Sequence, residues 1–267
     1  MKSAGAIGVF DSGVGGLSVL QHIRQLLPHE RLIYVADSGH VPYGDKSPEY
    51  IEQRSLALTR FLIEQGTDAI VIACNTATAA AVTTLRNQFS LPIVGMEPAV
   101  KPAVAATRSG VVGVLATTGT LESARFAALL ERYGEEVKIV TQGCPGLVEQ
   151  VEHGELDSAQ TRELITRYTA PLLARGADTL ILGCTHYPFL APLIREVVGA
   201  NITLVDTGSA VARQLGQRIE NELPARARGS AASVQFFTSG DAAIASLVIT
   251  ALWQQVVTAR QLPHAFL

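Results

Sequence analysis

The sequence predicts an α/β fold in which helices cover both faces of parallel sheets. Short runs rich in Val, Ile and Leu alternate with amphipathic stretches of helical length over the 267 residues, a pattern typical of parallel sheets buried on both sides. An internal repeat supports this prediction. The stretches GTDAIVIACNTAT at 66–78 and GADTLILGCTHYP at 176–188 are both apolar runs that end at a cysteine, Cys74 or Cys184, followed by polar residues.

The repeat extends over a whole half of the chain. The two cysteine units are offset by 110 residues, and setting Gly8 on Gly113 and Val35 on Val140 gives a shared offset of 105. Open α/β sheets hold their ligands at the carboxyl ends of the strands. We therefore expect two pseudo-symmetric, flavodoxin-like domains whose cysteine loops face each other across a cleft. The expected limits are residues 1–98 with 209–267 for the first domain and 99–208 for the second.

The elements of the first half follow from local signals. An apolar run leads into a glycine-rich loop at 11–16, and Pro28 stops the helix that follows. Ser47 is a suitable N-cap and Pro48 a suitable first residue for a long helix that Gly66 ends. We expect strands at 7–10, at 32–36, before Cys74 and at 93–96, and helices at 17–27, 48–65 and 77–87.

From Gly110 the same order of elements starts again. The connection at 224–233 carries Arg226 and Arg228, a basic pair that we expect in a solvated surface loop. A helix at 210–223, a strand at 233–237 and a helix at 242–257 are expected to return the chain to the first domain. The second half itself is predicted to have strands at 111–115, 137–140, 179–183 and 202–205, and helices at 121–133, at 163–175 and from Pro188.

The composition indicates a folded protein whose partners are small molecules. Hydrophobic residues make up 48% of the chain, which is enough for buried cores. Lys and Arg number 21 against 24 Asp and Glu, without a polybasic run, so neither nucleic acid nor a membrane is an expected partner. No apolar stretch has transmembrane length and no signal-peptide core precedes the first strand, so we expect a cytoplasmic protein. Three cysteines far apart argue against a disulfide framework.

Cys74 and Cys184 are the candidate catalytic residues. Each is expected where a strand leads into a helix, and the unpaired N–H groups and dipole of a helix N-terminus favour the thiolate. A thiolate and a thiol on opposite sides of one carbon can remove a proton from one face and return one to the other, which inverts the configuration. These loops contain no Lys or Arg. Backbone, hydroxyl and amide donors would then hold the ligand, which suits a small dicarboxylate better than a polyphosphate.

The two copies of the repeat have different residues at the positions where assisting groups are expected. Asp11 corresponds to Ala116 on the offset of 105, and His186 corresponds to Thr76 on the offset of 110. We therefore expect a carboxylate beside the first thiol and an imidazole beside the second. Glu152 comes from a loop-to-helix segment of the second half and is a candidate helper on the imidazole side.

Each of these assignments competes with a structural one. Asp11 could be an N-cap for the following helix, and Glu152 could be an exposed acid in a first helical turn. His186 could be a loop histidine bonded to backbone, and Tyr43 could close its loop by packing. Cys144 lacks the setting of the other two cysteines, and we expect it to be structural.

No cofactor or metal site is expected. Ser18 occupies the position where the glycine-rich loop would need its last glycine to complete G-x-G-x-x-G, and no G-x-x-x-x-G-K-[ST] occurs. The six histidines show no paired spacing with cysteine or carboxylate that suggests a metal site.

The chain resembles glutamate racemases, the cofactor-independent enzymes of the aspartate/glutamate racemase family. The motifs that carry the resemblance are FDSG at 10–13, VPYG at 41–44, ACNT at 73–76, Cys144-Pro145, and GCTHYP at 183–188. It implies that Cys74 addresses D-glutamate and Cys184 L-glutamate, with Asp11, Glu152 and His186 as helpers, and that D-glutamate is supplied for peptidoglycan synthesis. It also implies a possible homodimer. The substrate contacts that it implies are Asp11, Ser12, Tyr43, Gly44, Asn75, Thr76, Thr117, Thr120, Thr185 and His186.

Two other functions stay open at this point. One is a related cofactor-independent racemase or isomerase that acts on aspartate, a hydantoin or a similar acid. The other is a two-lobed binding protein that captures a small anion without chemistry. Some members of the family have a longer N-terminal extension linked to activation by a cell-wall precursor; only six residues precede Ile7 here, so we do not expect that regulation.

Overall fold

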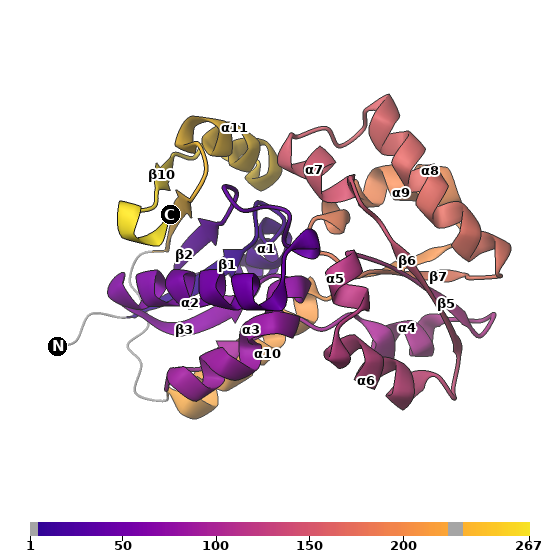
Figure 1. The fold of residues 1–267 in the computed structure, drawn as a ribbon, viewed down its shortest axis with the longest axis horizontal. Helices are drawn as coiled ribbons and strands as arrows, with labels where there is room; N and C mark the ends of the chain where they lie inside the picture. The colour runs from indigo at the N-terminus through magenta and orange to yellow at the C-terminus, as the bar shows by residue number, and fades with distance from the viewer. Residues whose placement is uncertain (1–4, 224–231) are drawn as a thin grey trace.

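The protein forms two lobes, each built on a parallel sheet covered by helices (Figure 1). The computed structural model describes residues 5–223 and 232–267. In the first sheet the strand order is β10-β9-β2-β1-β3-β4, and in the second it is β6-β5-β7-β8. The predicted α/β class is therefore confirmed. The strands are β1 (Ala6–Asp11), β2 (Arg31–Ala36), β3 (Thr67–Ile72), β4 (Ile93–Val94), β5 (Val111–Ala116), β6 (Lys138–Gly143), β7 (Thr179–Leu182), β8 (Thr203–Val205), β9 (Ser233–Thr238) and β10 (Ala259–Gln261).

Helices connect these strands and cover the sheets. The α-helices are α1 (Leu17–Leu26), α2 (Pro48–Glu64), α3 (Asn75–Gln88), α4 (Val100–Ala106), α5 (Thr118–Leu121), α6 (Ala124–Tyr133), α7 (Leu147–Glu152), α8 (Ala159–Ala174), α9 (Ala191–Val198), α10 (Gly208–Glu222) and α11 (Ala242–Trp253). Short 3₁₀ helices are η1 (Tyr43–Asp45), η2 (Tyr187–Leu190) and η3 (His264–Phe266). The long helix α2 begins as predicted, because the Ser47 hydroxyl accepts the Tyr50 N–H and proline follows it.

The two sheets repeat one topology. The order β2-β1-β3-β4 of the first lobe matches β6-β5-β7-β8 of the second. Gly8 pairs with Ile70 and Gly113 pairs with Leu180, which agrees with the offset of 110. The offset of 105 is wrong for the second strand, because Val140, the partner of Gly113, corresponds to Ile33, the partner of Gly8, and not to Val35. The connection through α5 and α6 is two residues longer than the connection through α1, and surface connections tolerate such additions.

Alternate residues of the central strand β1 bury their side chains on opposite faces of the first sheet. Ile7 and Val9 pack into a core with α1, α10 and α11, whereas Phe10 packs with α2 and α3. The first of these cores continues into the second lobe, where it includes Leu180 and Leu182 of β7. The two lobes therefore share a continuous apolar contact on one side.

Several element ends differ from the prediction. Helix α4 and strand β10 were not predicted, since each is short and lacks a clear periodic pattern. The helix predicted at 121–133 begins later, because Ser123 caps α6 by accepting the Phe126 N–H. The last helix ends at Trp253 rather than at residue 257, because Gln254 adopts a left-handed conformation with φ of 59°.

The chain passes from one sheet to the other after β4 and returns after β8, so that α10 lies with the first lobe (Figure 1). The domain limits at 98/99 and 208/209 stay a prediction. Arg226 and Arg228, expected in a surface loop, lie outside the described residues. In the described part of the chain, no helix combines the length and apolar character needed to cross a bilayer.

Candidate active site

Both cysteine loops line one pocket between the lobes. The free space at this pocket, including solvent at its mouth, is about 280 Å³, and little of it has room for a water molecule. The loops must therefore separate before a ligand of amino-acid size can enter. The lining residues are Ser12, Pro42, Tyr43, Gly44, Cys74, Asn75, Thr76, Thr117, Thr120, Val148, Gly183, Cys184, Thr185 and His186.

Cys74 follows β3 and is the N-cap of α3. Its Sγ lies 3.4 Å from the Ala77 backbone nitrogen, whose N–H it accepts. The residue is 5% exposed. Burial, and next the negative charge of Asp11, raise the pKa of Cys74 well above its ordinary value, while the Ala77 N–H opposes them. The thiol form is therefore favoured at this position.

Cys184 follows β7 and has different neighbours. The helix predicted from Pro188 is the 3₁₀ turn η2, and α9 starts only at Ala191. Cys184 Sγ lies 3.6 Å from Nδ1 of His186, and Nε2 of that ring lies 2.6 Å from Oε1 of Glu152. Burial opposes a charge on His186, but the hydrogen bonds to Cys184 and Glu152 outweigh it and raise the pKa of His186 well above its ordinary value. A protonated imidazole at this position can donate a hydrogen bond to the sulfur of Cys184.

The glycine-rich loop after β1 reaches across the cleft to this imidazole–carboxylate pair. The Val14 N–H donates to Glu152 Oε1 at 2.6 Å, and the Gly15 nitrogen lies 3.2 Å from His186 Nε2. A Cβ on Gly13 would lie 1.9 Å from Glu152, and a Cβ on Gly15 would lie 2.2 Å from His186. These glycines are therefore needed for the close approach of backbone to the two side chains. Sequence reasoning missed this role because it tested the loop only as a nucleotide motif.

Asp11 ends β1 and is fully buried between the two thiol loops. Its carboxylate accepts the backbone N–H groups of Ser12 and Gly16, at 2.7 and 2.6 Å. It also accepts the hydroxyl of Thr185, 3.2 Å away in the other lobe. Burial raises the pKa of Asp11, while the charge of His186 and a hydrogen bond with Cys74 act in the opposite direction. A structural role as a loop anchor and a role beside Cys74 are both consistent with this geometry.

A hydroxyl cluster closes the opposite side of the pocket. Thr76 Oγ1, from the first lobe, lies 2.9 Å from Thr117 Oγ1 and 3.2 Å from Thr120 Oγ1 of the second lobe. The side-chain oxygen of Asn75 is buried in the wall of the pocket and has no hydrogen-bond partner among the residues that the structure describes. Because a buried acceptor without a partner is unfavourable, this oxygen is suited to receive a donor from a ligand.

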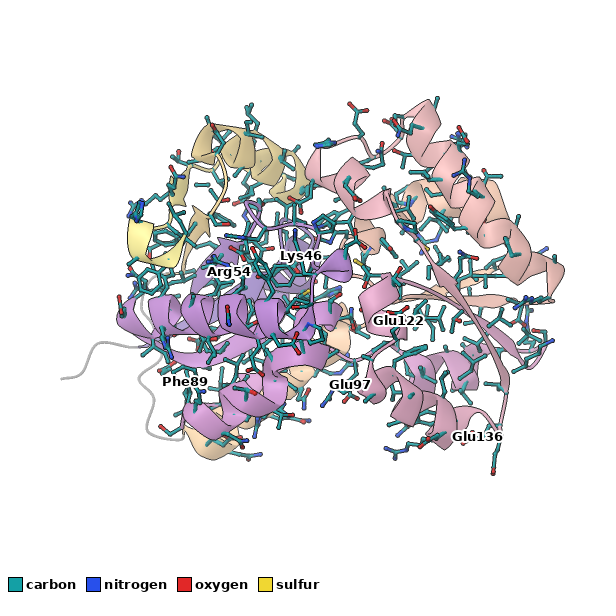
Figure 2. All side chains as sticks on the ribbon, in the orientation of Figure 1. Lys46, Arg54, Phe89, Glu97, Glu122 and Glu136 are labelled. Atoms are coloured by element: carbon teal, nitrogen blue, oxygen red, sulfur yellow. The ribbon has the colours of Figure 1, made fainter. Side chains whose placement is uncertain are left out.

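Tyr43 is held by a buried ion pair behind the pocket. Its hydroxyl donates to Asp37 at 2.5 Å, and Arg54 binds the same carboxylate through two nitrogens, at 2.7 and 3.0 Å. Arg54 comes from α2 and is labelled in Figure 2. The tyrosine hydroxyl gives its proton to Asp37 and therefore has none left to donate to a ligand. Lys46 and Glu122, also labelled, line a wider cavity outside the pocket, one from each lobe.

The structure brings nearly all of the predicted site residues together. Of the expected substrate contacts, all except Asp11 line the pocket, and Asp11 lies directly behind it. Glu152 also lies behind the lining, in contact with His186. Pro42, Val148 and Gly183 line the pocket and were not predicted. Cys144 is buried outside it, where burial raises the pKa of its thiol to about 12.

Comparison with known proteins gives a consistent family assignment. The Asp/Glu/hydantoin racemase family matches residues 7–215. The chain is 58% identical over 260 residues to the glutamate racemase of Methylococcus capsulatus, which covers 97% of this chain and 96% of the relative.

Solved structures agree with this assignment. The crystal structure of glutamate racemase isoform RacE1 from Bacillus anthracis has a TM-score of 0.87 at 31% identity and covers 98% of each chain. Escherichia coli glutamate racemase in complex with L-glutamate and the activator UDP-MurNAc-ala has a TM-score of 0.86 at 34% identity, covering 97% of this chain and 98% of that one. The chain belongs to the Asp/Glu/hydantoin racemase family of isomerases, and within it to the group of the glutamate racemases.

Proposed function

We propose that this protein interconverts L- and D-glutamate by moving the α-proton between two thiols, without a cofactor, and that it supplies D-glutamate for peptidoglycan synthesis. The observation that carries the proposal is that Cys74 and Cys184, from two copies of one loop, line the same closed pocket. The names of the relatives support glutamate as the substrate.

The two thiols have environments that fit opposite protonation states. His186, held by Glu152, can donate a hydrogen bond to the sulfur of Cys184, and we assign the thiolate of the proposed cycle to this side. Burial and Asp11 favour the thiol at Cys74. In this state Cys184 can take the α-proton of L-glutamate while Cys74 gives a proton to the opposite face. After D-glutamate has formed, Cys184 is the thiol and Cys74 is the thiolate. The reverse reaction uses the two groups in exchanged roles.

The remaining pocket residues are suited to hold a small amino dicarboxylate. The free oxygen of Asn75 can accept a hydrogen bond from an ammonium group. Ser12, Thr76 and Thr185 offer hydroxyl groups around the two sulfurs. Donors placed at the substrate carboxylate would also stabilise the negative charge that develops when the α-proton leaves.

Incubation of the purified protein with L-glutamate in D₂O, without pyridoxal phosphate, tests the proposal. We expect D-glutamate to form and deuterium to appear at the α-carbon of the product. If the protein racemises aspartate but not glutamate, it is the related racemase. Binding without deuterium incorporation would indicate the two-lobed binding protein. A homodimer and a cytoplasmic location stay predictions.

A further inference from the structure

A two-thiol racemase has to reset its protons after each turnover. When L-glutamate has become D-glutamate, Cys184 carries the proton that it removed and Cys74 has lost one. A second L-glutamate can react only after Cys184 has given up its proton and Cys74 has gained one. While the lobes are closed, the pocket that holds both sulfurs has little room for water, so proton exchange at Cys184 in this state needs another route.

A chain of hydrogen-bonding groups leads away from Cys184. Cys184 Sγ is 3.6 Å from His186 Nδ1, and His186 Nε2 is 2.6 Å from Glu152 Oε1. The other carboxylate oxygen of Glu152 accepts the hydroxyl of Ser38 at 3.2 Å. The His186 side chain is 1% exposed, whereas that of Glu152 is 8% exposed. The chain thus starts at a buried thiol and ends at a carboxylate that reaches solvent.

The imidazole has a partner for Nε2 in both of its protonation states. When Nε2 carries a proton, it donates to Glu152 Oε1. When it has lost that proton, it can accept the N–H of Gly15, whose nitrogen lies 3.2 Å away. A group that passes protons must be stabilised before and after transfer. The glycine-rich loop supplies this second partner.

Glu152 opens onto a second cavity, which is separate from the substrate pocket. This cavity has a volume of about 220 Å³, enough for several water molecules. It lies where α7 meets α11, two helices that lie side by side in Figure 1. Its walls include Ser38, Glu152, His153, Asp241 and Ile244, and Ile244 is 62% exposed. The cavity therefore connects the carboxylate with the surface.

We propose that His186 and Glu152 form a proton relay that resets Cys184 through this cavity. Once Cys184 is a thiol, its charge no longer helps to raise the pKa of His186, and the ring loses one proton and keeps the one on Nε2. The S–H bond of Cys184 then breaks as its proton moves to Nδ1 of His186, the proton on Nε2 moves to Glu152, and Glu152 releases a proton to water in the cavity. His186 takes back one proton from this water through Glu152, so Cys184 and His186 together lose one proton in each reset. Cys74 gains one proton from water, so the enzyme as a whole keeps its proton count. The inference rests on the proposed two-thiol function. Glu152 acts through His186 and does not contact the substrate pocket.

Within residues 5–223 and 232–267, no corresponding chain of groups leads from the first thiol to solvent. Asp11, the carboxylate nearest to Cys74 in the repeat, is 0% exposed. Its hydrogen bonds go to Cys74, Ser12, Gly16 and Thr185, all of which are buried. Proton exchange at Cys74 is therefore expected when the cleft opens for product release.

Two rates measured on one enzyme separate the reset from the chemistry. Net conversion of saturating L-glutamate requires one reset in every turnover. Transfer of label from L- to D-glutamate in an equilibrated mixture requires no reset. After one L-glutamate has reacted, Cys184 is the thiol and Cys74 the thiolate, and this form of the enzyme reacts directly with a D-glutamate. The ratio of label transfer to net conversion thus reports the reset alone.

Glu152→Gln is the direct test. The amide keeps a hydrogen-bonding group near His186 but cannot carry a proton, so we expect net conversion to fall by roughly tenfold or more relative to label transfer. Added imidazole buffer should restore net conversion and leave label transfer unchanged. Ser38→Ala, which keeps both relay groups, should shift the ratio in the same direction by a smaller amount.

Glu149→Gln is the matched control, since Glu149 precedes Glu152 by one turn of α7 and does not line the cavity. It should leave the ratio at the wild-type value. Equal loss of both rates in Glu152→Gln, including complete loss, together with an unchanged ratio in Ser38→Ala, would overturn the relay. Absence of label transfer in the wild-type protein would instead contradict the proposed racemisation.

Discussion

The two cysteine loops occupy equivalent positions in the repeat but have different chemical surroundings. Cys74 caps an α-helix, and its sulfur accepts a backbone N–H. Cys184 is followed by a 3₁₀ turn, and its sulfur faces an imidazole that is paired with a carboxylate. Duplication of the fold thus places both sulfurs at one pocket, while different side chains contact each of them.

Contacts across the cleft show the same mixture of symmetry and difference. The threonine of each cysteine loop reaches the loop after the first strand of the other lobe. Thr76 meets the hydroxyl of Thr117, and Thr185 donates to the carboxylate of Asp11. The first contact joins two neutral groups and the second involves a buried acid. Four experiments test this difference between the two cysteine loops, either by removing a group that causes it or by measuring its effect.

Replacing either sulfur should have the largest effect. Cys74→Ser and Cys184→Ser should each lower kcat by roughly 10²–10⁴-fold or more, because serine is a far weaker acid and a poor proton carrier at neutral pH. Conversion of both enantiomers, followed by chiral chromatography, measures this. Cys144→Ser is the control and should stay close to wild type, since Cys144 lies outside the pocket. Near-normal turnover by either active-site variant would exclude the two-thiol scheme.

Replacing the assisting groups should separate the two sides. Asp11→Asn should make proton transfer at Cys74 limiting, and His186→Asn should make transfer at Cys184 limiting, each with a loss of roughly 10–10²-fold. The substrate isotope effect distinguishes them. We expect α-deuterated D-glutamate to show the larger effect in Asp11→Asn and α-deuterated L-glutamate the larger effect in His186→Asn. The same pattern in both variants would mean that the helpers are not assigned to separate thiols.

The raised pKa of His186 predicts how stability depends on pH. A group whose pKa is raised in the folded protein contributes stability fully below its unfolded pKa, about 6.5 for histidine, and loses that contribution as the pH rises through the folded pKa. His186→Gln removes the contribution. The difference in free energy of unfolding between wild type and this variant, measured in urea, should therefore be larger at pH 6 than at pH 9. A difference that grows with pH would contradict the raised pKa.

The smallest effect is expected at the hydroxyl contact between the lobes. Thr117→Val removes the hydrogen bond to Thr76 across the cleft, worth about 0.5–1.5 kcal/mol, and should raise KM by roughly threefold to tenfold. It also removes the hydroxyl that caps α5 by accepting the Thr120 N–H, so the free energy of unfolding of the variant is measured beside KM. Thr185→Val should cost more, because it takes a donor from the buried carboxylate of Asp11. Steady-state kinetics of both variants measure the contrast. A larger increase in KM for Thr117→Val than for Thr185→Val would contradict the prediction that the contact between Thr185 and Asp11 contributes more to the closed cleft.

Much of the fold was predictable because it depends on local patterns. The apolar runs before Cys74 and Cys184 correspond to β3 and β7, and their offset agrees with the strand register. The cap formed by Ser47 and Pro48 was also confirmed. Prediction was less accurate where one local signal was weak, as at α4, or where a turn residue lacked an obvious signature, as at Gln254.

The site was predictable as a set of residues but not as a network. Asp68 and Asp178 repeat as regularly as the cysteines, yet Asp178 lies away from the pocket and accepts N–H groups of Arg108 and Ser109 in the turn before β5. Sequence repetition alone cannot separate such a turn anchor from a reactive group. The distinction requires knowing what each side chain faces.

The sequence by itself determined the α/β class, the duplicated half and the two thiols, because strand and helix periods and repeated motifs are local properties of the chain. Only the tertiary structure decided that Glu152 meets His186 and the Val14 N–H, and that both cysteines line one pocket. These contacts join residues as much as 138 positions apart. They depend on how two sheets and their loops pack against each other, and that packing is set by the sum of many contacts rather than by any single stretch of sequence.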